Sequence, residues 1–88
     1  MWDEEKRLSN IGKHGLDFFE INIVFEGETV TIFDDRFDYG ENRFITFGLS
    51  NGRVVAIGHT ETDAVIRIIS ARKATKNEEI NYFREIKN

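Results

Sequence analysis

Cysteine is absent from this sequence, histidine occurs twice, and no apolar run is long enough to cross a bilayer. Without cysteine the chain has no disulfide and no thiolate ligand for zinc, and two histidines leave little material for another metal centre. We therefore expect neither a metal nor a cofactor. The opening Met1-Trp2-Asp3-Glu4-Glu5 is acidic and unlike a secretory signal, so we expect a soluble cytoplasmic protein.

Positive charge is also scarce, because the net charge is -4 at pH 7. An acidic surface argues against general nucleic-acid affinity, which needs clustered cations. The charge is distributed unevenly, however: residues 1–44 carry 5 Lys and Arg against 11 Asp and Glu, whereas residues 45–88 carry 7 against 5. The second half of the chain can therefore hold a local cationic site.

The length and the local signals predict one small domain that begins with helices. Eighty-eight residues support a single modest core, so residues 1–88 are expected to form one domain. A first helix is predicted over residues 3–13, with acids in its first turn and Gly15 as a left-handed cap. A second helix is predicted to begin at Asp17, which opens a capping-box pattern, and to end near Gly27.

From residue 28 onward the apolar period changes to two, which predicts strands. They are expected over residues 29–33, 43–49, 53–59 and 65–71. Thr75 and Glu78 form a capping box, so a final helix is predicted over residues 75–87. Because the connections are short, the expected fold class is α+β, a four-stranded antiparallel sheet with two N-terminal helices and one C-terminal helix.

The segment Ile66–Ala74 is a β-branched strand that carries an arginine and ends in a basic cluster. An arginine among isoleucines is costly to bury unless a negative group meets it. In a regular strand Arg67 and Arg72 face opposite sides, about 16 Å apart at 3.3 Å per residue. A strand that ends or bulges near Ser70 brings Arg72 back toward Arg67, and the two guanidinium groups, with Lys73 nearby, then favour a phosphate site.

Two further groups of residues leave alternatives open. In the third predicted strand His59 and Glu61 share a face, and such a pair can act as a general base and its orienter, or His59 can be structural. Lys6, Asn10 and Lys13 share one face of the first helix, where a solvated stripe is the simpler interpretation. For His14, at the end of that helix, the simpler interpretation is complementation of the helix dipole. The simpler interpretation of Arg67 is likewise an ion pair with Glu61, with Arg72 solvated.

One set of residues runs nearly from end to end of the chain: Trp2-Asp3, Lys6, Asn10, Lys13-His14-Gly15, Phe18, Val24-Phe25, Arg43-Phe44-Ile45, Gly48, His59-Thr60-Glu61, Ile66-Arg67-Ile68-Ile69-Ser70-Ala71-Arg72-Lys73-Ala74, Glu78 and Tyr82. With this set the chain resembles the BrnT family, bacterial toxins of type II toxin–antitoxin pairs with a RelE-like fold. The early Lys-His-Gly followed by Arg-Ile-Ile-Ser-Ala-Arg-Lys-Ala is the most specific part of the resemblance.

The resemblance implies an endoribonuclease that needs no metal and halts translation by cutting RNA. It also implies neutralisation by a BrnA-like antitoxin, which binds operator DNA, in a heterotetramer built on the antitoxin dimer. We expect no specific DNA binding by this chain itself and no membrane association. The matching positions suggest a site formed by Lys13, His14, Glu61, Arg67, Ser70, Arg72 and Tyr82.

Chemistry assigns hypothetical roles to these residues. A ribose 2′-hydroxyl attacks the adjacent phosphate, Glu61 or His59 takes its proton, and Arg67 and Arg72 stabilise the developing charge. The predicted catalytic residues are His59, Glu61, Arg67, Ser70, Arg72 and Tyr82, and the predicted RNA-binding residues are Lys13, His14 and Lys73.

A second function class uses the same surface without catalysis. In it, the basic strand end docks an acidic segment of a partner protein, and the domain is an interaction module. A DNA-binding repressor fits poorly, because the sequence has neither a helix-turn-helix pattern nor an extended basic face.

Overall fold

The structure, a computed structural model, describes residues 1–36, 38 and 40–87. Over these residues the chain forms, in order, α1 (Glu4–His14), α2 (Phe18–Ile21), the 3-10 helix η1 (Asn22–Glu26), β1 (Val30–Asp34), β2 (Arg43–Ser50), β3 (Arg53–Thr62), β4 (Val65–Lys73) and α3 (Lys76–Lys87). The described strands form one antiparallel sheet in the order β1-β2-β3-β4. The predicted α+β fold is confirmed, with helices before and after the sheet.

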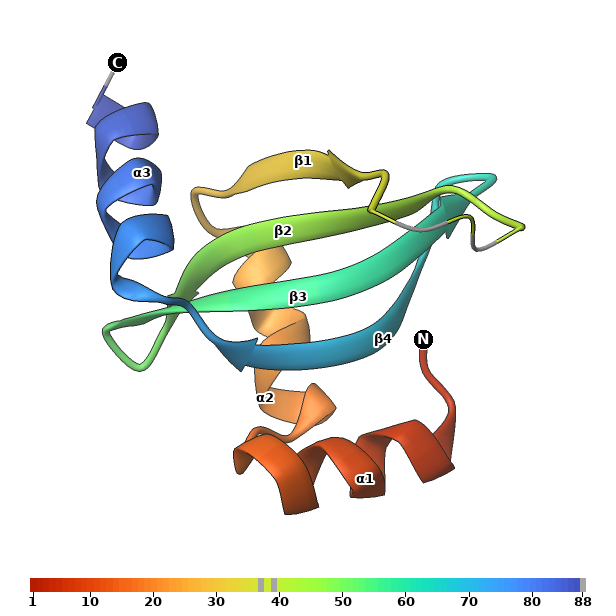
Figure 1. The fold of residues 1–88 in the computed structure, drawn as a ribbon. Helices are drawn as coiled ribbons and strands as arrows, with labels where there is room; N and C mark the ends of the chain where they lie inside the picture. The colour runs from red at the N-terminus through yellow and green to blue at the C-terminus, as the bar shows by residue number, and fades with distance from the viewer. Residues whose placement is uncertain (37, 39, 88) are drawn as a thin grey trace.

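Figure 1 shows how the helices surround the sheet. α2 crosses one face of it, α1 lies alongside β4, and α3 stands at the end of the sheet. In the described part of the chain, no helix is both long and apolar enough to span a membrane.

The helix ends follow the predicted capping signals. Asp3 accepts a hydrogen bond from the backbone N–H of Glu5 and begins α1, and Gly15 ends it at a φ of 68°. Asp17 caps α2 by accepting from the N–H of Phe19. The second helix continues to Gly27 as a 3-10 segment, since this stretch is rich in β-branched residues that crowd an α-helical turn.

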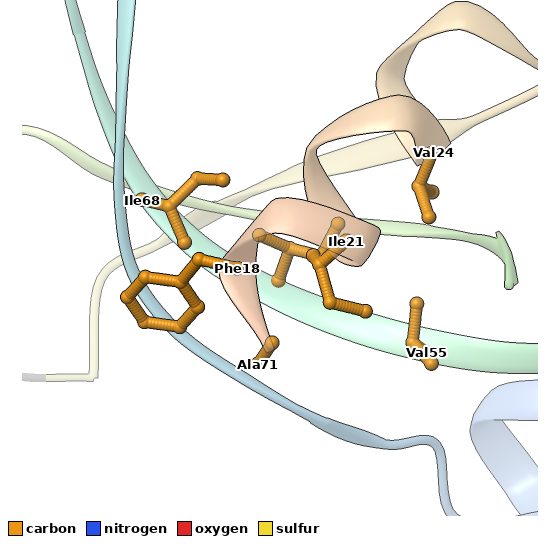
Figure 2. Packing of buried hydrophobic residues seen from close by; sticks show 7 residues of the cluster. Phe18, Ile21, Val24, Val55, Ile68 and Ala71 are labelled. Atoms are coloured by element: carbon orange, nitrogen blue, oxygen red, sulfur yellow. The ribbon is translucent and has the colours of Figure 1, made fainter. Parts of the chain in front are cut away.

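The main apolar cluster lies between α2, η1 and one face of the sheet, here called the covered face. Phe18 and Ile21 are fully buried and point at the strands (Figure 2). They meet Val55 of β3 and Ile68 and Ala71 of β4, all at most 1% exposed. Burial of this apolar surface holds the short helix on the sheet.

The opposite side of the sheet, here called the open face, is covered at one end only. There Tyr82 and Ile86 of α3 pack on Phe47, Val54 and Ala56. The Tyr82 hydroxyl donates to the Glu28 carbonyl oxygen over 2.7 Å, which fixes α3 at that end. The remainder of this face is hollowed and lined by charged side chains.

The free edge of β4 is closed by the N-terminal segment. Trp2 forms a parallel bridge with Ile68, and the Ile68 N–H donates to the Met1 carbonyl oxygen at 2.8 Å. Asn10 accepts from the Ala71 N–H at 2.9 Å. Asn10 is only 5% exposed, so the interpretation of the first helix as a solvated stripe is wrong at this position.

Candidate functional site

A β-bulge in β4 decides where its arginines point. Gly58 pairs with Ser70 and His59 pairs with Ile68, so Ile69 is an extra residue that has no partner in the β3–β4 register. Across Ile69, the alternation of side chains between the two faces of the sheet shifts by one residue. As a result Arg67 and Arg72, an odd number of positions apart, lie on the same face of the sheet.

Three cross-strand rows of the open face carry the candidate site, because directly opposed residues share a face. The first row is Arg43, Thr60 and Arg67, the second is Ile45, Gly58 and Ser70, and the third is Phe47, Ala56 and Arg72. Ser70 therefore lies in the row between the two arginines. A Cβ built on Gly58 would lie 2.7 Å from the Ser70 Oγ, so the glycine makes room for that hydroxyl.

Three adjoining hollows form a cationic groove over this region. The first is lined by Arg36, Arg43, Ser70 and Arg72, with Asp34 and the strand floor. The second is lined by Lys6, Arg43, Glu61 and Arg67, among others. The third lies between α1 and β4 and is lined by Lys6, Lys13, His14 and Ser70. Ile69 lines all three hollows, so the bulge is their meeting point.

Several acids neutralise part of this positive charge. Arg36 forms a two-point ion pair with the buried Asp34, at 2.8 and 3.1 Å, and Arg43 lies 3.3 Å from Glu41. No ion pair with a described residue is found for Arg67, which contradicts the predicted pairing with Glu61.

Arg72 is held by a carboxylate from α3. Its two terminal nitrogens donate to the two oxygens of Glu78, at 2.7 and 2.9 Å, so the expectation that Arg72 is solvated is wrong. The Glu78 hydrogen bonds raise the pKa of Arg72. Glu78 also completes the predicted capping box, accepting from the Thr75 N–H at 2.8 Å. The first turn of α3 and the orientation of Arg72 are therefore fixed by one side chain.

Glu78→Gln should destabilise the protein in a pH-dependent way. Hydrogen bonds from Arg72 lower the pKa of Glu78 from its ordinary 4.5 to about 2. The carboxylate therefore stabilises the fold above pH 4.5, and this contribution disappears as the pH falls toward about 2. After a discount for its partial exposure, we expect a loss of about 1–2 kcal/mol at neutral pH. Urea unfolding of both proteins at neutral and acidic pH measures the difference.

Glu79→Gln is the matched control, because Glu79 lies on the same turn and is exposed. It should change the free energy of unfolding by less than about 0.5 kcal/mol at either pH. An equal loss in both variants, or a Glu78→Gln loss that persists near pH 2, would contradict the role given to the Arg72 ion pair.

Three other predicted residues lie where the groove can use them. Glu61 alternates onto the same face as His59, but it lies near the end of β3, where it lines the second hollow with Arg67, and its side chain is 46% exposed. Lys13 and His14 are exposed on the last turn of α1 and line the third hollow beside Ser70. The fold thus brings together cations from α1, β2 and β4 with accessible carboxylates that include Glu61.

Three predicted residues lie elsewhere, and their direct roles are corrected. His59 is fully buried on the covered face, so it cannot contact RNA. Tyr82 of α3 is 2% exposed and packs against Phe47 and Val54 at the other end of the sheet. Lys73 pairs with Val55, whose side chain is in the covered-face cluster, so Lys73 points away from Arg72.

The sequence interpretation missed two arginines of the groove. Arg43 begins β2 and shares the Thr60 row with Arg67, which follows once the hairpin register is known. Arg36 follows β1 in the connection to β2, and no sequence pattern relates it to Arg72. Among the described residues, no group of three or more His, Cys, Asp or Glu is placed to hold a metal ion.

Comparison with known proteins identifies the family of the chain. No curated protein matches the chain significantly. Residues 2–78 match the profile of a protein family described as "Ribonuclease toxin, BrnT, of type II toxin-antitoxin system". That match spans the sheet, α1, α2 and the start of α3, including all residues that line the cationic groove except Met1. The chain therefore belongs to the BrnT family of type II toxin–antitoxin ribonuclease toxins.

Proposed function

We propose that this chain is a metal-independent endoribonuclease that inhibits translation by cleaving RNA in the cationic groove. The observation that carries the proposal is the convergence of Arg67, Ser70 and Arg72 on one face of the sheet through the bulge at Ile69. Guanidinium groups offer planar pairs of donors that suit phosphate oxygens. Such a site stabilises a phosphorane without a metal or a covalent intermediate.

In the proposed reaction a ribose 2′-hydroxyl attacks the adjacent phosphorus, and Glu61 accepts the hydroxyl proton. The bond to the 5′ oxygen then breaks, and that oxygen takes one proton from Lys13 or His14. The products are a 2′,3′-cyclic phosphate and a 5′-hydroxyl. Arg67 and Arg72 hold the extra negative charge that develops on the phosphoryl oxygens, and Ser70 donates between them.

Arg72 can take part while it remains bound to Glu78. A guanidinium has five N–H donors. The Glu78 contacts use one from each terminal nitrogen, and Nη1 also donates to the Lys73 carbonyl oxygen at 3.3 Å, so two donors remain. The Arg72 side chain is 36% exposed, so its remaining donors can reach a phosphate in the groove. Glu78 thereby orients Arg72 and reduces the entropy lost when RNA binds.

Arg67→Ala tests the proposal directly. The purified protein is incubated with single-stranded RNA in EDTA, and fragments are analysed for cyclic-phosphate ends. We expect the wild type to produce such fragments and Arg67→Ala to cleave about 10²- to 10³-fold more slowly, the usual loss for one donor to a developing oxyanion.

Arg53→Ala is the control, because Arg53 is an exposed cation on the same sheet, about 23 Å from the Arg67 row at 3.3 Å per residue. It should cleave at the wild-type rate. An Arg67→Ala variant as active as the wild type would remove Arg67 from the mechanism. A wild-type chain that produces no fragments would favour the alternative, a module that docks an acidic partner segment without catalysis.

Neutralisation by a BrnA-like antitoxin is part of the same proposal. The family description names a type II system, in which the antitoxin is a protein. A partner that places acidic side chains in the cationic groove would pair with Arg67, and the same contact would exclude RNA. We expect a heterotetramer joined through the antitoxin dimer. The neighbouring reading frame identifies this partner if it encodes a small protein with a DNA-binding pattern.

A further inference from the structure

His59 is a buried titratable group to which the mechanism above gives no role. His59 is fully buried between β2, β3 and η1. Its ring lies edge-on to Phe25, with centroids 5.2 Å apart, and stacks on Phe44 at 5.9 Å. Burial lowers the pKa of His59, so the imidazole is neutral near pH 7. A neutral ring has one N–H donor and one acceptor, and the surroundings decide which nitrogen is which.

One ring nitrogen belongs to a chain of hydroxyl groups. The Nε2 atom lies 2.7 Å from the Thr46 Oγ1, and that hydroxyl lies 2.7 Å from the Thr31 Oγ1. If Thr31 donates to Thr46 and Thr46 donates to Nε2, both threonine hydroxyl protons are used in hydrogen bonds. The Nε2 atom then accepts, and the ring proton is on Nδ1.

The other ring nitrogen is unsatisfied and faces Glu61. Within the described structure, the Nδ1 atom has no hydrogen-bond partner. The Glu61 Oε1 lies 3.8 Å away, beyond hydrogen-bond range but close enough for a small side-chain movement to close the gap. An unpaired buried N–H is costly, and a lone pair facing a carboxylate is repulsive. Both considerations favour an Nδ1–H that donates to Glu61.

We propose that His59 is a positioning residue that holds the Glu61 carboxylate as the base of the ribonuclease site. The inference rests on the proposed function, since it assigns the base to Glu61, and it chooses between the two candidates, Glu61 and His59, that the sequence left open. His59 never touches RNA. The Thr31–Thr46 chain fixes its tautomer, and the Nδ1–H aims a carboxylate that lines the same hollow as Arg67.

The side chains that face the imidazole make this coupling specific. Phe25 of η1, Phe44 and Thr46 of β2, and the opposed Ile68 of β4 are uncharged. Among the described residues, Glu61 is the carboxylate within ion-pair range of the ring. A change in the imidazole therefore acts on the groove through Glu61.

Two substitutions at His59 separate positioning from packing. The amide of His59→Asn can replace the Nδ1–H, whereas the longer His59→Gln reaches the position of Nε2 and leaves Glu61 without a donor. We expect His59→Gln to lower kcat by about 10- to 100-fold with little change in KM.

His59→Asn should keep most of kcat, although thermal unfolding should show that both variants are destabilised. A purely structural role predicts a different result. Both variants would then lose activity in parallel with stability, which would overturn the inference.

Long-range ¹H–¹⁵N NMR of the wild-type imidazole gives a readout that needs no activity. We expect the Nδ1–H tautomer, and a shift of the Nδ1 resonance in Glu61→Gln. The Nε2–H tautomer would overturn the inference even if RNA is cleaved normally. An Nδ1–H tautomer in a chain that cleaves no RNA would instead overturn the proposed function and the catalytic part of this inference with it.

Discussion

The double variant Arg67→Ala/Arg72→Ala is expected to cleave RNA about 10³- to 10⁴-fold more slowly than the wild type. Each single variant should lose about 10²- to 10³-fold, so the loss in the double variant is smaller than the product of the two single losses. The reason is geometric, because the bulge places both guanidinium groups on one face with Ser70 in the row between them. Two groups that stabilise the same phosphorane act as a unit, so the second removal costs less than the first.

A double-mutant cycle on single-turnover rates measures this coupling. Arg53→Ala/Arg84→Ala is the matched control, since it removes two exposed cations that do not line the groove. All variants are assayed well below their unfolding temperatures, because Arg72→Ala also leaves Glu78 without its ion pair. Strictly multiplicative losses would show that Arg67 and Arg72 bind different phosphates, and the shared-anion mechanism would fail.

Phe18→Ala is expected to lower the free energy of unfolding by about 3–5 kcal/mol. Phe18 is fully buried in the covered-face cluster and packs edge-on against Trp2, with centroids 6.2 Å apart. A chain of this length has a total stability of roughly 4–13 kcal/mol, so one truncation removes a large fraction of it. The variant should therefore lose activity through unfolding, which denaturant titration with parallel activity measurements can show.

Phe19→Ala is the neighbouring control. Phe19 is 65% exposed and contacts Trp2 and the Arg7 guanidinium at the surface. Its truncation should cost less than about 1.5 kcal/mol, because exposed aromatic and cation–π contacts are weak. Equal losses at positions 18 and 19 would contradict the assignment of α2's inner face.

The order and type of the main elements could be predicted because their signals are local. Acids, Gly15 and the Thr75–Glu78 capping box act within a few residues, and they place α1 and α3 within one residue of the observed ends. Strand β3 is longer than predicted, because a turn with positive φ at Asp63 and Ala64 closes the hairpin after Thr62. Non-glycine residues at positive φ give a weak sequence signal.

The candidate site was less predictable because it depends on register. Strict alternation would place Arg67 and Arg72 on opposite faces of the sheet. No feature of the amino-acid sequence identifies Ile69 as the bulge residue that brings them to the same face. Burial was equally hidden at Asn10, whose amide closes the β4 edge although its neighbours on the helix are exposed. Alternation placed His59 and Glu61 on one face correctly, but only the helix above that face shows that the imidazole is enclosed.

The two sides of the sheet differ in how much they contribute to folding. The covered face holds the cluster under α2 and η1, whereas the arginine end of the open face has a floor of Gly58 and Ser70. Substitutions at that end remove little buried apolar area, so most of them should leave the chain folded. An evolving lineage can therefore change the side chains that line the groove one residue at a time, without first acquiring compensating mutations elsewhere.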